Sequence, residues 1–225
     1  MNLDKFHNIS NALKSHHKLI AVSKGQDIDK IKHLYDIGHR DFGENFLQEL
    51  KKKKDMLPKD ITWHFLGNIQ SNKVKEIVAC SDLVHSVSRL KVLDKISQLD
   101  AKKNIEILLQ LKLGEEQTKS GFSEIEIYEI MEQNQFKNIT IKGLMVIGEG
   151  RIEEEKLIAQ FLHAGNVFNK MKTMKKDVEY LSMGMSNDYE LALAYGSNMV
   201  RIGTSIFGAR TKCCLLYTSD AADES

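Results

Sequence analysis

The sequence predicts a (β/α)8 TIM barrel with an extra amino-terminal helix. Strand-like apolar runs alternate with segments that carry apolar residues at helical spacing, and eight such runs occur. Parallel strands joined by right-handed crossovers form either an open doubly wound sheet or a closed barrel, and eight strands favour the barrel. A chain of 225 residues that is 42% hydrophobic can bury one sizeable core, so residues 1–210 are expected to form a single domain.

The predicted elements follow in order from these two spacings. Short runs rich in apolar residues predict strands, and the first of them, LIAVS, is followed by Lys24. In chain order the predicted strands cover 19–23, 41–45, 62–67, 83–88, 105–113, 141–148, 179–185 and 199–208. Apolar residues three and four positions apart predict helices at 2–15, 28–38, 46–57, 72–80, 89–99, 124–133, 153–174 and 189–197. The lysine run 51–54 is expected to face solvent on its helix.

Charge and composition narrow the classes of partner. Lysine and arginine total 32 and aspartate and glutamate 31, so no excess of one sign is present to attract nucleic acid or an anionic membrane surface. No apolar run reaches the roughly 18 residues of a membrane span, and the polar start lacks the centre of a secretory signal. We therefore expect a cytoplasmic monomer that binds small molecules.

The cysteines do not point to metal or redox chemistry. Cys80, Cys213 and Cys214 have neither metal-ligand spacing nor a disulfide framework, and Cys80 is expected to be an inert buried thiol. Residues 211–225, TKCCLLYTSDAADES, change composition abruptly after IFGAR and show no period. We interpret them as a non-native extension or a disordered tail and assign no function to them.

Polar residues gather where the predicted strands end, which is the edge at which both candidate folds bind ligands. Lys24 follows the first strand, and Arg201, Gly203 and Thr204 lie in the eighth. A closed barrel would place these two strands side by side. The other candidates at strand ends are Glu44, Asn45, His64, Asn68, Ser182, Met183, Gly184 and Ser186, of which the methionine is expected to pack.

The pairing of Lys24 with the IGTS segment has a chemical meaning. A lysine desolvated by apolar walls loses preference for its charged form and can attack an aldehyde as an amine. Glycine and threonine in IGTS, next to SMGMS, offer backbone N–H and hydroxyl donors to a phosphate. An aldehyde that carries a phosphate indicates pyridoxal 5′-phosphate.

Seven segments strengthen this interpretation by resemblance. They occur in a fixed order over residues 5–210: AVSK, FGEN, WHFLGNIQSNK, KSGF, GLMVIG, LSMGMSND and GSNMVRIGTSIFGAR. Together they resemble the pyridoxal phosphate homeostasis protein family. That family is similar in fold to the amino-terminal barrel of alanine racemase, and its members bind pyridoxal phosphate covalently without an established reaction of their own.

The resemblance implies roles for individual residues. Lys24 would form the internal aldimine, and Arg201 would face the pyridine nitrogen. The remaining implied contacts are Ser186, Gly203 and Thr204 with the phosphate, and Asn45 and His64 along the ring side. The sequence departs from the family after the lysine, where GQDID replaces the usual threonine and proline, so a looser loop is expected there.

Other interpretations of these residues stay open. His64, beside Trp63, could be a core histidine with both ring nitrogens satisfied, and Arg201 could pair with an acid such as Glu44. Lys119 in TKSGF could take part in receiving or releasing the cofactor, or could be a solvated loop lysine.

Three functions remain at this stage. The first is a non-catalytic carrier that holds the cofactor, keeps its free concentration low and passes it to apo-enzymes through transient contacts. The second is an amino-acid racemase: a cation at the ring nitrogen weakens the electron sink and makes aminotransferase-like activity unexpected, but racemases tolerate such an arginine. A racemase also needs a second acid/base, which alanine racemase takes from a separate domain that this sequence is not expected to contain. The third is a class I aldolase in which Lys24 forms a Schiff base with a sugar phosphate.

Overall fold

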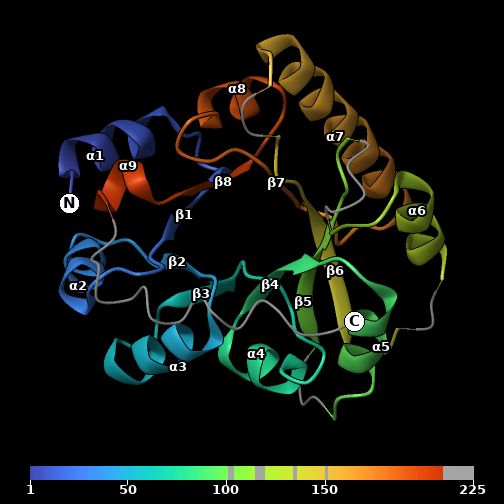
Figure 1. Ribbon diagram of the computed structural model, residues 1–225, viewed down its shortest axis with the longest axis horizontal. Helices are drawn as coiled ribbons and strands as arrows, with labels where there is room; N and C mark the ends of the chain where they lie inside the picture. Colours follow the sequence, from blue (N-terminus) through green and yellow to red (C-terminus); the bar gives the residue numbers. More distant parts are fainter. Residues whose placement is uncertain (101–103, 115–119, 134–135, 150–151, 210–225) are drawn as a thin grey trace.

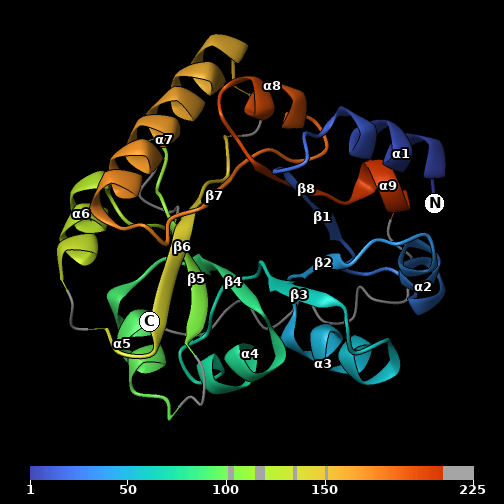
Figure 2. The same ribbon diagram turned by 180° about the vertical axis from the view of Figure 1, so that it is seen from behind.

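Eight parallel strands close into a barrel in chain order, with β1 hydrogen-bonded to β8. The computed structural model describes residues 1–100, 104–114, 120–133, 136–149 and 152–209. The strands form a ring in Figure 1, and the helices surround it on the outside; the reverse view in Figure 2 shows the same arrangement. The strands are β1 (Lys18–Val22), β2 (Asp41–Glu44), β3 (Thr62–Phe65), β4 (Leu83–Val87), β5 (Ile105–Gln110), β6 (Ile139–Met145), β7 (Tyr180–Ser182) and β8 (Met199–Ile202). The predicted TIM barrel is confirmed.

The helices follow the strands, with one additional helix at the start of the chain. They are α1 (Leu3–Ala12), α2 (Ile28–Asp36), α3 (Leu47–Met56), α4 (Val74–Cys80), α5 (Leu90–Ser97), α6 (Glu124–Glu132), α7 (Glu154–Met174), α8 (Tyr189–Ala194) and α9 (Thr204–Phe207). Helix α1 lies beside α9 in both ribbon views, and the Asn2 backbone N–H donates to the Ile206 carbonyl at 2.7 Å. The two ends of the described chain therefore meet next to the β1–β8 seam.

Apolar side chains pack in two places. The larger cluster lies between the outer face of the strands and the helices, and it includes Phe42, Trp63 and Phe65. A smaller cluster fills the inside of the barrel, as expected for side chains that alternate along each strand. It consists of Ile20, Leu83, Leu108, Met145 and Met199.

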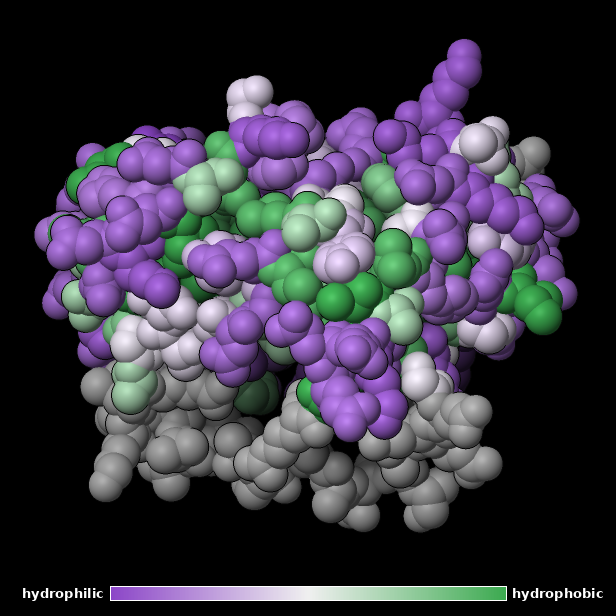
Figure 3. Space-filling model, turned by 90° about the horizontal axis from the view of Figure 1, so that it is seen from above, coloured by the Kyte–Doolittle hydropathy of each residue, from purple (hydrophilic) through white to green (hydrophobic). Residues whose placement is uncertain are grey.

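The outer surface is mainly hydrophilic on the face that Figure 3 shows. Hydrophobic side chains are interspersed among the hydrophilic ones there. In the described part of the chain, no helix combines the length and apolar character that crossing a membrane would require.

The predicted element boundaries differ from the structure mainly at the carboxyl ends of strands. The expected strand 199–208 is β8 followed by the short helix α9, because the chain turns at Gly203. The expected strand 105–113 ends at Gln110, and beyond it Leu111 makes only an isolated bridge to Phe122. The residues that follow β5 and β8 lie at the carboxyl-terminal mouth of the barrel, where apolar residues are buried although they belong to no strand.

The lysine run was predicted to face solvent, and for Lys53 that prediction is wrong. Only 4% of its surface is exposed, whereas Lys52 is exposed. Lys53 continues the buried stripe of Leu47 and Leu50 on α3, with the next buried position at Leu57. Helical spacing alone placed it against the barrel.

Candidate functional site

Lys24 lies at the carboxyl-terminal mouth of the barrel, two residues after the end of β1. It is half-buried, and its neighbours Ser23 and Gly25 are buried. Gly25 has φ of 64°, the left-handed conformation that glycine adopts without a steric penalty. The loop therefore turns sharply directly after the lysine.

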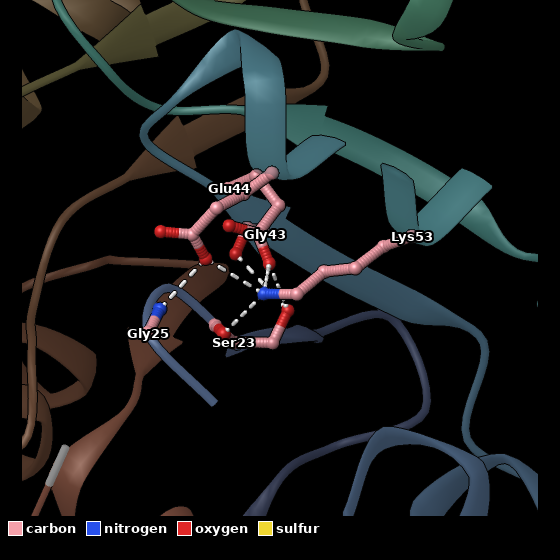
Figure 4. A network of polar contacts seen from close by, with 6 residues as sticks. Ser23, Gly25, Gly43, Glu44 and Lys53 are labelled. Atoms are coloured by element: carbon pink, nitrogen blue, oxygen red, sulfur yellow. Dashed lines mark hydrogen bonds and ion pairs between the residues drawn. The ribbon is translucent and has the colours of Figure 1, made fainter. Parts of the chain in front are cut away.

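Ionic contacts between α3 and β2 support this loop, and we call Glu44, Glu49 and Lys53 the lysine-side cluster. Figure 4 shows Lys53 and Glu44 of this cluster next to Ser23 and Gly25. The Lys53 Nζ lies 2.7 Å from Glu44 Oε1 and 2.9 Å from Glu49 Oε2. It also donates to the Ser23 carbonyl at 2.8 Å, and the Ser23 hydroxyl donates to Glu44 Oε1 at 2.6 Å. Burial raises the pKa of Glu44 to about 7, even though the Lys53 charge and hydrogen bond oppose the rise.

Arg201 points into the barrel from β8 and is 5% exposed. Its Nη1 donates to the Ser182 carbonyl at 2.8 Å and to the Ser182 hydroxyl at 2.7 Å, and its Nη2 donates to the Val146 carbonyl at 2.8 Å. Burial lowers the pKa of Arg201 to about 10, with the Asp188 charge opposing, so the side chain stays cationic at neutral pH. The alternative pairing with Glu44 is wrong, because Glu44 points to α3 on the outside of the barrel.

His64 lies in the core of the barrel and is 1% exposed. Its Nε2 lies 3.0 Å from Asp41 Oδ1, and its Nδ1 lies 3.0 Å from His85 Nε2. The interpretation as a core histidine with both ring nitrogens satisfied therefore describes its surroundings.

These contacts belong to a series of hydrogen bonds through the barrel interior, which we call the interior hydrogen-bond network. It runs from Asp41 through His64 and His85 to Ser182, whose hydroxyl lies 3.3 Å from His85 Nδ1, and ends at Arg201. At its lower end, Lys18 contacts Asp41 at 3.1 Å. The interior hydrogen-bond network thus connects the two mouths of the barrel.

The chemistry of its two ends fixes their roles in this network. Burial opposes ionisation of Asp41, but the hydrogen bond and charge of His64, together with Lys18, lower the pKa of Asp41 to about 2. Burial, reinforced by His64 and Arg201, lowers the pKa of His85 well below its usual value and keeps this ring neutral. The Asp41 carboxylate can only accept hydrogen bonds and the Arg201 guanidinium can only donate them, so the roles of the two ends are fixed.

Ser186, Gly203 and Thr204 lie together where β8 passes into α9. The Ser205 backbone N–H, in the first turn of α9, is 3.5 Å from the Ser186 hydroxyl oxygen. A Cβ on Gly203 would lie 3.2 Å from the Val22 carbonyl, so this glycine lies directly against the end of β1. The register of Ala21 opposite Ile202 places Lys24 and Thr204 at the same end of neighbouring strands.

Asn45 lines a cavity of about 370 Å³ at the same mouth, together with residues from the ends of β3 to β6. The backbone approaches closely here, because a Cβ on Gly67 would lie 1.8 Å from the Asn45 carbonyl oxygen. Asn68 is exposed at the rim of this cavity. A larger cavity of about 840 Å³ lies at the opposite mouth and contains Lys18 and Asp41 but none of the predicted cofactor residues.

The remaining sequence predictions have different outcomes. Lys119 and residues 211–225 lie outside the described residues. Cys80 is half-buried rather than fully buried, and burial raises the pKa of its thiol. Met183 is buried in the core, as expected for a packing residue. No group of three or more His, Cys, Asp or Glu side chains that could hold a metal ion occurs among the residues that the structure describes.

Sequence reasoning missed Lys53, Glu49, Asp41 and His85. The helical stripe of α3 was the available signal for Lys53. Strand alternation was the signal for His85, because it follows the interior residue Leu83 by two positions. The i,i+4 spacing of Glu49 and Lys53 on α3 was a further signal, whereas the other contacts join different strands or helices and could not be found this way.

The donor set fits pyridoxal 5′-phosphate. Lys24 supplies a primary amine at the mouth, and the first turn of α9 with Ser186 supplies N–H and hydroxyl donors of the kind that bind phosphate. The guanidinium of Arg201 has five N–H groups, and the contacts above use three of them. The others suit an unprotonated ring nitrogen, which accepts a hydrogen bond.

Comparison with known proteins gives a consistent result. Residues 2–211 match the family model described as alanine racemase, N-terminal domain. A pyridoxal phosphate homeostasis protein from Vibrio alginolyticus is 35% identical over 201 residues, which cover 86% of both chains. A protein of the same name from Helicobacter pylori is 35% identical over 215 residues, covering 91% of this chain and 94% of that protein.

Solved structures agree with the family match. PipY from Synechococcus elongatus, without PLP, has a TM-score of 0.85 and 32% identity, and the match covers 91% of this chain and 99% of PipY. The PipY structure with PLP bound has a TM-score of 0.81 and 31% identity over the same shares. An alanine racemase from Clostridium difficile, at 16% identity and a TM-score of 0.72, shares the fold over 94% of this chain and 57% of its own.

Proposed function

Because the chain belongs to the alanine racemase N-terminal domain family, and within it to the pyridoxal phosphate homeostasis proteins, we propose that it holds pyridoxal 5′-phosphate on Lys24 and delivers it to apo-enzymes. The single observation that carries this proposal is the side-by-side position of β1 and β8, which brings the loop of Lys24 to the same end of the barrel as Gly203 and Thr204. The PLP-bound PipY structure supports the choice of cofactor.

Each residue of the mouth takes one task in this proposal. Condensation of the Lys24 amine with the aldehyde forms a C=N bond and releases one water, and hydrolysis reverses it. Ser186, Gly203 and Thr204 bind the phosphate, and Asn45 lines the ring side. Arg201 donates to the ring nitrogen, and His64 acts on the ring only through the interior hydrogen-bond network.

The proposed contact of Arg201 with the ring nitrogen argues against aminotransferase-like chemistry and leaves the racemase alternative to experiment. A cation that donates to the ring nitrogen disfavours its protonation and weakens the electron sink that carbanion chemistry needs. Lys24 then serves to bind and release an aldehyde, and reversible attachment to the protein lowers the concentration of free cofactor. We place this activity in residues 1–210, as a cytoplasmic monomer that meets apo-enzymes transiently.

The first experiment replaces Lys24. Lys24→Ala is expected to abolish the yellow adduct and the borohydride-trapped pyridoxyl group, while the melting temperature changes little because the side chain lies at the mouth rather than in the packed interior. Lys52→Ala is the matched control, since Lys52 is exposed on α3. A trapped pyridoxyl group on Lys24→Ala at the wild-type level would refute the role of Lys24.

Two further measurements separate carrier from enzyme. Loaded protein is mixed with an apo-enzyme while a trap scavenges free pyridoxal phosphate, and only direct delivery activates the apo-enzyme under these conditions. Amino acids are then incubated with loaded protein in deuterated solvent. Exchange of the α-hydrogen at a catalytic rate would favour the racemase alternative over the carrier.

A further inference from the structure

The two residues that flank Lys24 are both held by the lysine-side cluster. The Ser23 carbonyl accepts from Lys53 at 2.8 Å (Figure 4). The Gly25 N–H donates to Glu49 Oε2 at 2.8 Å. The Ser23 hydroxyl adds a 2.6 Å bond to Glu44 Oε1. The backbone is therefore fixed immediately before and immediately after the lysine.

Lys53 is the centre of this arrangement. A lysine ammonium has three N–H donors, and those of Lys53 have three acceptors: the Ser23 carbonyl, Glu44 and Glu49. The acceptors come from the loop after β1, from β2 and from α3 itself. A single buried ammonium thus ties the loop of Lys24 to the neighbouring strand and to the helix behind it.

The lysine-side cluster places two charged residues where they are almost completely buried, which indicates a role other than simple stabilisation. Lys53 is 4% exposed and Glu44 is fully buried, and Glu44 Oε2 has no hydrogen-bond partner among the described residues. Buried ion pairs often stabilise a protein no better than apolar residues of similar size, whereas their directional contacts can specify one geometry. The lysine-side cluster is therefore better suited to setting the shape of the loop than to adding stability.

We propose that Lys53, through Glu44 and Glu49, is the positioning residue for Lys24: it fixes the backbone on both sides of Lys24 and so directs the amine into the mouth of the barrel. The inference rests on the proposed function of Lys24. Lys53 itself lies on α3, outside the ring of strands, and reaches the loop of Lys24 through the Ser23 carbonyl. Small displacements of a reacting group cost large factors in rate, and the loop residues GQDID contain no proline that would stiffen the loop instead.

The test separates reaction at Lys24 from binding in the pocket. The variant is Lys53→Met combined with Glu44→Gln, which removes the contacts of the ammonium without leaving Glu44 as an unpaired buried charge. Pocket binding is measured with pyridoxine 5′-phosphate, which has the ring and the phosphate but no aldehyde. Reaction at Lys24 is measured as the rate at which pyridoxal 5′-phosphate becomes trapped by borohydride, read from the intact mass.

We expect the double variant to keep the wild-type affinity for pyridoxine 5′-phosphate and to lose roughly ten- to a hundredfold in the rate of attachment. Lys52→Met, in the same lysine run but exposed, should match the wild type in both measurements. Glu49→Ala, at a partly exposed position, removes the Gly25 anchor and should lower the attachment rate even if the double variant folds poorly. Wild-type attachment rates in folded Glu49→Ala or in the folded double variant would overturn the inference.

The outcome for the wild type keeps the two proposals apart. If wild-type protein neither binds pyridoxine 5′-phosphate nor is trapped with the aldehyde, the proposed function fails. If wild-type protein does both, and the variants attach the cofactor as fast as it does, only the role of Lys53 fails. A parallel loss of analogue affinity and attachment would indicate damage to the whole pocket and would also overturn the positioning role.

Discussion

The two sides of the candidate site are supported by opposite kinds of polar structure. The lysine-side cluster consists of two carboxylates and one ammonium, lies between the barrel wall and α3, and holds backbone atoms. The interior hydrogen-bond network runs inside the barrel through two histidines and a serine, and it holds the guanidinium group of Arg201. A loop residue such as Lys24 is thus positioned by contacts to the backbone of its neighbours, whereas a strand residue such as Arg201 is positioned by contacts to its own guanidinium group.

The two regions also respond to protons in opposite directions. Burial raises the pKa of Glu44 to about 7, so its ionised form is held in the fold at a cost. Burial acts in the same direction on Asp41, but His64 and Lys18 outweigh it and lower its pKa to about 2, so ionised Asp41 stabilises the fold. The comparison can therefore be tested by substitutions and by pH.

The largest effect is expected for Lys53→Met. Removing the ammonium leaves Glu44 and Glu49 without their cation, and breaking a buried pair in this way costs about 3–5 kcal/mol in the free energy of unfolding. Denaturant unfolding at pH 7 measures it, and adding Glu44→Gln should recover a large part of the loss. A loss as small as that of the exposed control Lys52→Met would show that the lysine-side cluster is not an energetic unit.

The next effect is the pH dependence contributed by Glu44. Its pKa is higher in the folded protein than in the unfolded chain, so the folded state binds more protons between about pH 4.5 and pH 7. Stability should therefore fall as the pH rises through this window, by about 3 kcal/mol from this group. The measurement is the unfolding free energy of wild type minus that of Glu44→Gln at several pH values, which cancels the other titrating groups. A difference that stays flat would contradict the raised pKa.

Asp41 should show the opposite sign and a smaller size. Its folded pKa lies below the unfolded value of 3.8, so its contribution of about 2 kcal/mol is present above pH 4 and is lost as the pH falls toward 2. Asp41→Asn should remove this contribution at pH 7 and flatten the acid limb. Asp36→Asn, which breaks an exposed pair with Lys32, is the control that should do neither. If the free energy of unfolding fell equally at acid pH in wild type and in Asp41→Asn, the interior hydrogen-bond network would not depend on an ionised Asp41.

The sequence predicted the barrel and the pairing of its first and last strands, because strand and helix periods are local and eight parallel strands have few ways to close. It also placed Lys24 and the IGTS segment correctly at one mouth. It could not predict the contacts that hold Lys24 and Arg201. His85 and Ser182 are 97 positions apart and Ser23 and Lys53 are 30 apart, and which buried groups meet depends on side-chain packing across the finished barrel.

The smallest effect is expected for Lys18→Met, which tests whether the interior hydrogen-bond network ends at Asp41. The Lys18–Asp41 pair lies at the open lower mouth, with 35% and 23% of the two side chains exposed, so water and salt screen it. We expect a loss of about 0.2–1 kcal/mol at low salt that disappears at high salt. His64 still donates to Asp41 in this variant, so the network to Arg201 should remain intact and the absorption spectrum of bound pyridoxal 5′-phosphate should not change. If Lys18→Met shifted that spectrum while Asp41→Asn did not, the order of links from Arg201 to Asp41 would be wrong, and the lower mouth would reach the cofactor pocket by another route.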